Sequence, residues 1–164
     1  MNETELKSIR DRLDIAEVMT RYATGIDNVN LDILRSCFAD EVEIQASSAG
    51  KLHELFQRAG FDHGVKLKRD DWVNNLGAGM RSNGVTVTQH VITNHFVELG
   101  GDEAVCTSYL RAMHFNGTQF PGSPPYEVGG YYRNTLVRTP AGWKIRKWTL
   151  TCTWETGDTR VLLG

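Results

Sequence analysis

The sequence is poor in the features on which disulfide-stabilised, zinc-binding or nucleic-acid-binding proteins depend. Its three cysteines form an odd-numbered set with no CxxC pair and no zinc-ligand spacing, which predicts reduced thiols and a cytoplasmic location. The charge is nearly balanced, with 18 Lys and Arg residues against 20 Asp and Glu residues, and the basic residues are scattered. Because non-specific binding of DNA or RNA needs a positive field, nucleic acids are not expected partners.

Membrane segments and the common cofactor motifs are missing as well. The first five residues include acids, and the uncharged stretch 82–97 is interrupted by Gln, Asn and His, so neither a signal peptide nor a membrane span is expected. The sequence has no GxSxG, GxGxxG, phosphate-loop or HExxH motif. We therefore expect neither a cofactor nor a bound metal ion.

What is present is the composition of one ordinary globular domain. The 164 residues are 40% hydrophobic and 23% charged. A chain of this length buries roughly 70% of its unfolded surface, which is enough for a core without a disulfide or metal. No internal repeat or linker divides the sequence, so residues 1–164 are expected to form a single domain.

The first half of the sequence has the spacing of helices. Apolar residues recur at three- and four-residue steps from 5 to 26, which predicts an amphipathic helix. Asn30 is a good N-cap for a second helix ending near residue 39. Further helices are expected over 52–58 and from Asp70 or Asp71 to Met80, with residues 59–68 irregular.

The second half changes to β-branched and aromatic residues separated by turn signals. A short strand is expected at 41–45, and four long strands at 85–99, 103–115, 126–138 and 143–154. Helices followed by consecutive strands predict an α+β fold. Gly129 and Gly130 indicate a bulge and a strongly curved sheet, whose concave face the N-terminal helices would cover. A curved sheet covered by helices forms a cone, and the inside of such a cone is the default place for a ligand site.

Two residues of the first predicted helix are candidates for that site. Asp27 lies at the carboxyl end of the helix, where the helix dipole disfavours a carboxylate, so it either builds the turn before Asn30 or serves a site. Tyr22 lies about 140° around the helix from Asp27, and both side chains can reach a cavity beneath the helix end. A single tyrosine at such a position is also a common core residue.

Two predicted strands offer polar residues to the same cavity. Alternation places His90, Asn94 and Phe96 on one face of strand 85–99 and His95 on the other. On strand 103–115, small residues share a face with His114, which makes that face the candidate cavity wall. A lone strand histidine is usually structural, so these residues need partners to define a site.

Several segments together resemble the SnoaL-like branch of the nuclear transport factor two-like superfamily over essentially the whole chain. They are Tyr22 to Asp27, Cys37 to Asp40, His90 to Asn94, Ala104 to Tyr109, Gly129 to Tyr132, and Gly142 with Trp143. The resemblance implies a cystatin-like α+β barrel, in which a curved antiparallel or mixed sheet forms a cone.

The resemblance also assigns roles. Asp27 and His90 match the catalytic pair of similar enzymes such as scytalone dehydratase, bile acid 7α-dehydratase and hexachlorocyclohexane dehydrochlorinase. Tyr22 matches a substrate-facing tyrosine, and His114 lies near the position of a second histidine. Relatives carry a pocket arginine where this chain has Trp148, and Arg146 is the candidate substitute. Segment 46–71 is longer than the resemblance implies and is predicted to be a lid or specificity insertion.

The predicted function is that of a cofactor-independent lyase acting on a hydrophobic, hydroxylated aromatic, diaryl or polycyclic small molecule. Asp27 would support His90 as the base, and Tyr22 would assist the departing oxygen. Dehydration is the favoured reaction, and loss of a small aldehyde is the second choice. The expected substrate-binding residues are His114, Asn94, Tyr131, Arg146, Trp148 and Phe96.

Other functions fit the same fold. One is a double-bond isomerase, and another is a non-catalytic binding module or a structural subunit resembling the small subunit of ring-hydroxylating dioxygenases. The resemblance further implies a homodimer, formed through the convex sheet face around Val91, Val97 and Val105.

Overall fold

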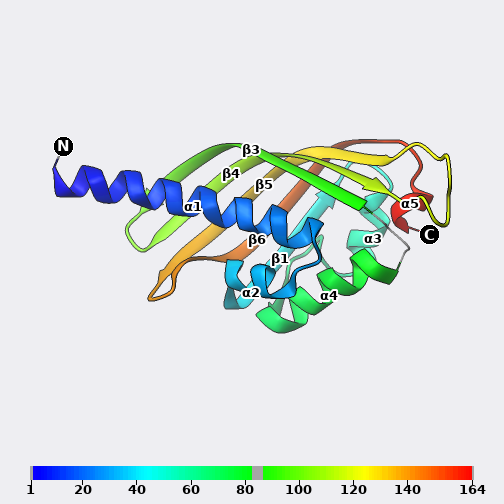
Figure 1. The fold of residues 1–164 in the computed structure, drawn as a ribbon. Coiled ribbons are helices and arrows are strands. Elements are labelled where there is room, and N and C mark those ends of the chain that lie inside the picture. The colour runs from blue at the N-terminus through cyan, green and yellow to red at the C-terminus, as the bar shows by residue number, and fades with distance from the viewer. Residues whose placement is uncertain (1, 83–86, 164) are drawn as a thin grey trace.

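The computed structural model describes residues 2–82 and 87–163, which form an α+β fold (Figure 1). The helices are α1 (Glu3–Asp27), α2 (Leu31–Cys37), α3 (Leu52–Arg58), α4 (Arg69–Ser82) and α5 (Arg160–Leu163). The strands are β1 (Phe38–Ser48), β2 (Val65–Lys68), β3 (Val87–Gly100), β4 (Glu103–Phe115), β5 (Tyr126–Thr139) and β6 (Gly142–Thr156).

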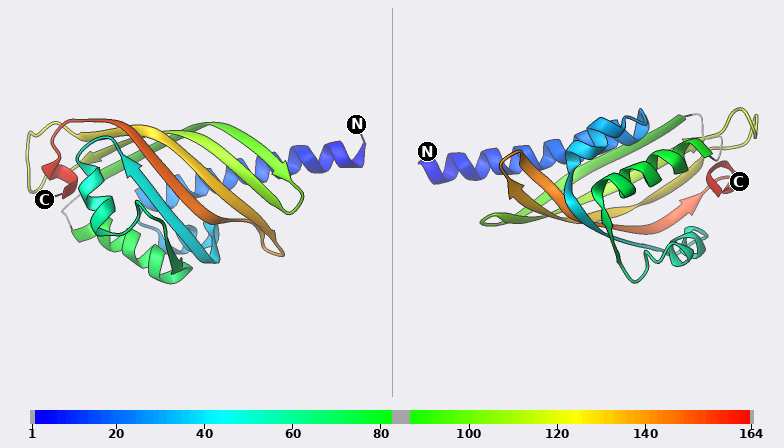
Figure 2. Two further views of the ribbon diagram at one scale, coloured as in Figure 1. Left: turned by 180° about the vertical axis from the view of Figure 1, so that it is seen from behind. Right: turned by 90° about the horizontal axis from the view of Figure 1, so that it is seen from below.

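The six strands form one mixed sheet in the order β2-β1-β6-β5-β4-β3. Neighbouring strands pair antiparallel except β1 and β6, which run parallel. The sheet bends around the helices but stays open, with β2 and β3 as its edges (Figure 2). The predicted α+β fold with a curved mixed sheet is therefore confirmed.

Helices α1, α2 and α4 lie on one side of the bent sheet, and the N-terminal part of α1 projects beyond the strands (Figures 1 and 2). The core lies between these helices and the sheet, where burial of apolar side chains stabilises the fold. Its largest fully buried side chains come from α1, α2, β1, β5 and β6: Tyr22, Tyr132, Phe38, Ile15, Met19, Leu34, Ile44, Leu136 and Ile145 among them.

Polar side chains fix helix α1 at its start and at Asp11, in its N-terminal half. Asn2 and Glu5 form a capping box at its start. Further along, the carboxylate of Asp11 accepts two hydrogen bonds of 2.7 Å from the guanidinium of Arg138 and one of 3.2 Å from the indole of Trp143. The hydrogen bonds from Arg138 outweigh the effect of burial and hold the pKa of Asp11 below its ordinary value. This clamp sets the direction in which α1 crosses the sheet.

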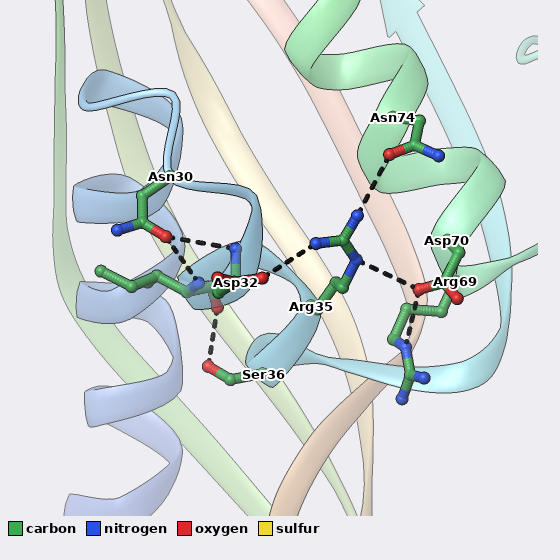
Figure 3. Close-up of polar contacts among 8 residues, drawn as sticks. Asn30, Asp32, Arg35, Ser36, Arg69, Asp70 and Asn74 are labelled. Atoms are coloured by element: carbon green, nitrogen blue, oxygen red, sulfur yellow. Dashed lines mark hydrogen bonds and ion pairs between the residues drawn. The ribbon is translucent and has the colours of Figure 1, made fainter.

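Arg35 links α2 to the start of α4 (Figure 3). Its guanidinium contacts Asp32 at 2.9 Å within α2, and Asp70 and Asn74 of α4 at 3.3 Å each. Exposed pairs of this kind add little free energy, so their main effect is geometric. They hold α4 beside α2, where the other face of α4 covers the sheet.

Besides an irregularity in the β1–β6 pairing between Phe38 and Glu43, three β-bulges interrupt the alternation of side chains in the described strands. In β3 the pairing with β4 shifts between Thr93 and Phe96, and Asn94 has a positive φ of 55°. In β6 one shift lies opposite Thr135 and Leu136, with Arg146 as the extra residue. The second shift in β6 lies opposite Gly129 and Gly130. The bulge predicted at these glycines is therefore confirmed, and the extra residue is on β6. Each bulge reverses which side chains face the helices beyond it.

The observed elements differ from the predicted ones in a few places. Residues 65–68, expected to be irregular, form β2 and pair with β1. Strand β1 is longer than predicted, because its parallel pairing with β6 continues through Ser48. The strand also begins at Phe38, so α2 ends at Cys37, two residues before the predicted end. Helix α5 was not predicted. Of the predicted strand 85–99, residues 85 and 86 lie outside the described residues.

Candidate active site

Asp27 and His90 meet at the edge of the sheet. Asp27 is the last residue of α1, and His90 lies on the edge strand β3. One carboxylate oxygen of Asp27 lies 2.6 Å from Nδ1 of His90, and the other accepts a 2.9 Å hydrogen bond from the backbone N–H of His90. The carboxylate therefore holds both the ring and the backbone of the same residue.

The environment of Asp27 favours its charged form. Burial by itself raises the pKa of a carboxyl group. Here the hydrogen bonds from His90, together with one of 2.9 Å from the hydroxyl of Thr88, outweigh burial and lower the pKa of Asp27. A charged carboxylate accepts from Nδ1–H, which leaves Nε2 of His90 as the nitrogen that can take a proton.

An apolar pocket of about 310 Å³ opens beside this pair. His90 and His114 supply polar atoms to its wall, and most other lining side chains are aliphatic or aromatic. They come from α3 and the following loop (Leu52, Leu55, Phe56, Ala59, Phe61), from α4 (Trp72, Asn75, Leu76, Gly79) and from strands β4, β5 and β6 (Leu110, Ala112, Val128, Tyr132, Trp148, Leu150, Cys152).

His114 is a buried, neutral neighbour of His90. The two rings meet edge to face, with centroids 5.7 Å apart. Nδ1 of His114 lies 3.3 Å from the backbone oxygen of Tyr126, so Nδ1 carries the proton and Nε2 is the acceptor nitrogen. Burial, and next the proximity of His90, lowers the pKa of His114 to about 4. At neutral pH this ring can accept a hydrogen bond but carries no charge.

Tyr132 and Trp148 form one side of the pocket, in front of Tyr22 of α1. Tyr132 and Trp148 line it, with ring centroids 5.5 Å apart. Tyr22 packs edge to face against Tyr132 at 5.8 Å but is fully buried behind it and is not among the lining residues. Burial raises the pKa of both tyrosines, so both keep their protons. The predicted direct contact of Tyr22 with substrate is thus corrected: Tyr132 stands between Tyr22 and the pocket.

Asn94 and Phe96, predicted to bind substrate, lie outside the pocket. The bulge after Thr93 inserts a residue, so inward alternation passes from His90 and Ile92 to His95 and Val97. Phe96 is 65% exposed as a result, and Asn94 is also exposed. The prediction that His95 faces away from His90 was wrong for the same reason.

Arg146 and Tyr131 also lie outside the pocket. Arg146 is the extra residue of the first β6 bulge, and its guanidinium pairs with Glu103 at 2.9 Å on the exposed side. It therefore does not replace the arginine that the resemblance led us to expect. Tyr131 points outward because strict alternation on β5 turns Tyr132 inward.

The inward-facing His95 contacts a second polar residue. Nδ1 of His95 lies 2.8 Å from the hydroxyl of Ser108, which is fully buried. Burial lowers the pKa of His95, so the pair is uncharged at neutral pH. Neither residue lines the pocket, and their contact fixes the bulge against β4.

Sequence reasoning found His90, Asp27, His114 and Trp148 but missed Tyr132 and Trp72. Tyr132 had a signal, because it shares alternation parity with Val128 on the same strand. Trp72 also had a signal, because it lies in the first turn of a helix, α4, whose apolar positions are spaced to face the sheet. Segment 46–71, predicted as a lid, supplies five of the lining side chains.

Neither a metal centre nor a membrane-spanning helix is formed by the described part of the chain. Among residues 2–82 and 87–163, no group of three or more His, Cys, Asp or Glu side chains is placed to hold a metal ion. Within the same ranges, no helix is long and apolar enough to cross a membrane.

Solved structures share this fold over nearly the whole chain. A Kribbella flavida protein of known structure is 25% identical with a TM-score of 0.77, covering 94% of this chain and 97% of that one. A candidate scytalone dehydratase from Novosphingobium aromaticivorans has a TM-score of 0.72 at 21% identity, covering 96% and 92%. A type 2 hexachlorocyclohexane dehydrochlorinase has a TM-score of 0.72 at 16% identity, covering 94% and 93%.

The fold is that of the nuclear transport factor two-like superfamily, as a Salmonella enterica superfamily protein with a TM-score of 0.67 also shows. Within it, residues 7–149 match the family model described as a SnoaL-like domain. The chain belongs to the SnoaL-like domain family. An uncharacterized Mycobacterium bovis protein is 28% identical over 139 residues, which are 84% of this chain and 82% of that protein.

Proposed function

We propose that this protein is a cofactor-independent lyase that eliminates water from a hydrophobic, hydroxylated small molecule. The observation that carries the proposal is the 2.6 Å contact between Asp27 and Nδ1 of His90 at the wall of an apolar pocket. A carboxylate on one ring nitrogen orients the imidazole and stabilises its protonated form, which makes the other nitrogen an effective base.

The elimination balances with the residues present. Nε2 of His90 takes a proton from a substrate carbon, and the C–H electron pair forms a C=C bond as the neighbouring C–O bond breaks. The proton on His90 then passes to the departing hydroxide, which leaves as water and restores the neutral imidazole. Asp27 stabilises the imidazolium between the two transfers.

The other polar groups assist at the departing oxygen. The acceptor nitrogen of His114 can hold the substrate hydroxyl in place. Tyr132 reaches the pocket, while Tyr22 behind it is a positioning residue that packs against the Tyr132 ring. Loss of a small aldehyde would use the same base on a different proton, in a substrate whose carbinol carbon is bonded to a carbon next to a carbonyl. Nε2 of His90 takes the hydroxyl proton, the O–H electron pair forms the aldehyde C=O as the C–C bond breaks, and the enolate that is left takes the proton back from His90.

Size and lining support an apolar substrate. A pocket of about 310 Å³ accommodates one or two rings, and its wall is largely aliphatic and aromatic. Segment 46–71 closes one side of it and is proposed as a lid that selects substrates. The names of two structural neighbours, a candidate dehydratase and a dehydrochlorinase, describe eliminations and agree in reaction type.

Mass spectrometry tests the proposal. Chelator-treated wild-type protein and the variants His90→Ala and Asp27→Asn are incubated with a panel of hydroxylated aromatic, diaryl and polycyclic compounds. We expect a product lighter by one water, or by a small aldehyde, with wild type and not with the variants. His63→Ala is the matched control, because His63 is exposed and remote in sequence from the pair. Ligand binding without any mass change would instead identify a binding module, and a shifted double bond at constant mass an isomerase.

We further propose a cytoplasmic homodimer formed through the outer face of the sheet. Of the residues expected there, Val91 is exposed, but Val97 is buried because the β3 bulge turns it inward. Tyr109 and Tyr131 are cross-strand neighbours on that face and are both exposed. Sedimentation should show a dimer that Tyr109→Glu dissociates, and a wild-type monomer at micromolar concentration would contradict the proposal.

A further inference from the structure

Helix α4 borders the pocket with one face, and that face includes a glycine. Trp72, Asn75, Leu76 and Gly79 all line the pocket. They stand at positions i, i+3, i+4 and i+7, which share one face of an α-helix. The large side chains of Trp72 and Leu76 are therefore followed, on the same face, by a position that has no side chain.

Neither the backbone nor the packing of α4 requires a glycine at position 79. Glycine lowers the stability of a helix relative to alanine. Gly79 has a helical backbone without the positive φ that favours glycine, and a Cβ built on it would meet no atom of the described residues within 4 Å. Gly77 differs, because a Cβ there would lie 2.6 Å from Cδ2 of Leu31 in α2. Packing against α2 accounts for Gly77, whereas Gly79 borders only the pocket.

The pocket opens to solvent beside Gly79. Its lining residues from β4, β5 and β6 are all buried, whereas Leu55 of α3, Ala59 just after α3, and Asn75 of α4 are exposed. Gly79 is half-buried. We call these four residues the pocket mouth. Because Leu55 and Ala59 are apolar and Gly79 adds no side chain, the mouth can take up an apolar part of a ligand.

We propose that Gly79 is a specificity-determining residue, which lets the apolar body of a polycyclic substrate extend from the pocket into its mouth. The pocket of about 310 Å³ accommodates one or two rings, and a third fused ring would lie against the bare helix backbone at Gly79. A larger side chain at this position would fill the same space. The inference deepens the proposed function: it rests on that function for the hydroxyl group and the reaction, and on the geometry of α4 for the size of the substrate.

Binding of two hydroxylated probes tests the inference without turnover. 2-Naphthol has two fused rings and 2-phenanthrol has three, and the hydroxyl is on a terminal ring in both. Equilibrium dialysis measures Kd for wild-type protein and for the variants Gly79→Ala and Gly79→Leu. Ala78→Leu is the matched control, because it places a leucine one residue earlier, at an exposed position that does not line the pocket.

We expect wild-type protein to bind 2-phenanthrol about fivefold more tightly than 2-naphthol, because the third ring buries further apolar surface. Gly79→Leu should weaken binding of 2-phenanthrol about tenfold or more and leave the affinity for 2-naphthol within about threefold, with Gly79→Ala in between. Ala78→Leu should change neither affinity. Equal losses for both probes in Gly79→Leu, an unchanged preference in that variant, or no preference of wild-type protein for the larger probe would overturn the inference.

Thermal unfolding checks that the space beside Gly79 is free in the folded protein. Alanine and leucine favour a helix more than glycine does, so Gly79→Ala and Gly79→Leu should both fold and raise Tm by about 2 °C. Gly77→Ala should have a lower Tm than Gly79→Ala, because Leu31 must move to admit its Cβ, and it should keep the preference for 2-phenanthrol. A Tm below that of wild type for Gly79→Ala would show that neighbouring side chains already fill this space, which contradicts the inference.

The outcomes separate this inference from the proposed function. A preference for the larger probe that Gly79→Leu removes, without turnover of any hydroxylated compound, would support the role of Gly79 and contradict the lyase. Turnover of hydroxylated compounds, with the same affinities for both probes in wild type and Gly79→Leu, would support the lyase and contradict the role of Gly79.

Discussion

Asp27 contacts His90 through both of its carboxylate oxygens, one on ring Nδ1 at 2.6 Å and one on the backbone N–H at 2.9 Å. The second contact is available because β3 is an edge strand, whose outward N–H groups have no neighbouring strand. One side chain at the end of a helix therefore seals a sheet edge and orients a base. The two tasks can be separated by mutation.

Asp27→Asn keeps the shape of the side chain but loses its charge and can stabilise the wrong imidazole tautomer. We expect kcat to fall roughly 10²- to 10⁴-fold, because a base without its carboxylate is poorly oriented and its protonated form is less stable. Steady-state kinetics with the substrate found by mass spectrometry measure this effect. Thr88→Val, which removes a single hydrogen bond to Asp27, is the control and should cost much less. Equal losses in both variants would show that Asp27 serves only the fold.

His114 should remain neutral in the folded protein down to a pKa of about 4. An unfolded histidine titrates near pH 6.5, so between these values the unfolded state binds more protons. The contribution of His114 to stability is therefore complete above about pH 6.5 and is lost as the pH falls toward 4. Histidine ring signals followed by NMR, assigned with His114→Gln, check this expectation. A midpoint near 6.5 for His114 would contradict its burial in a neutral form.

Asp11→Asn should lower the free energy of unfolding by about 2 kcal/mol or more, since it leaves Arg138 without its carboxylate partner. The pKa of Asp11 is lowered in the folded state, so its contribution is present above the unfolded pKa of about 4 and is lost as the pH falls through the folded value. Urea unfolding should show that the difference in the free energy of unfolding between wild type and variant is smaller at pH 3 than at pH 7. A gap independent of pH would mean that packing, not the charge, stabilises this end of α1.

Val29 is a β-branched residue with a positive φ of 48° in the turn between α1 and α2. An L-residue in this region costs about 1–2 kcal/mol, which glycine avoids. We expect Val29→Gly to be more stable than Val29→Ala by about 1 kcal/mol, or roughly 2–4 °C in Tm for a chain of this size. Calorimetry of the two variants measures the difference, and a more stable alanine variant would disprove the strain.

The sequence predicted the elements that depend on local periodicity and the residues that a family motif identifies. The long helix, the order of helices before strands, and the meeting of Asp27 with His90 all follow from spacing, capping and motif position. The sequence did not predict the short strand β2, because four residues of Val, Lys and Leu carry too little strand signal. This strand depends on its pairing with β1.

The wrongly placed pocket residues share one physical cause. A single extra residue in a strand reverses the facing of every side chain beyond it, and only one of the three bulges, the one opposite Gly129 and Gly130, had a glycine signal. At Asn94 and Arg146 the local sequence reads as an ordinary strand, so strict alternation assigned Phe96 and Arg146 to the wrong face. The same bulge in β3 turns Val97 inward, so its burial removes it from the proposed dimer surface.

The position of β6 between β1 and β5 affects how the chain acquires its pocket during synthesis. β6 is the last strand made, yet it is the partner of β1, which precedes it by about a hundred residues. Until β6 emerges from the ribosome, β1 has only the short β2 beside it, and Trp148, Leu150 and Cys152 are absent from the pocket wall. Such long-range pairing slows folding and leaves apolar surface uncovered in the growing chain. A nascent chain stopped before β6 should therefore bind chaperones and no ligand.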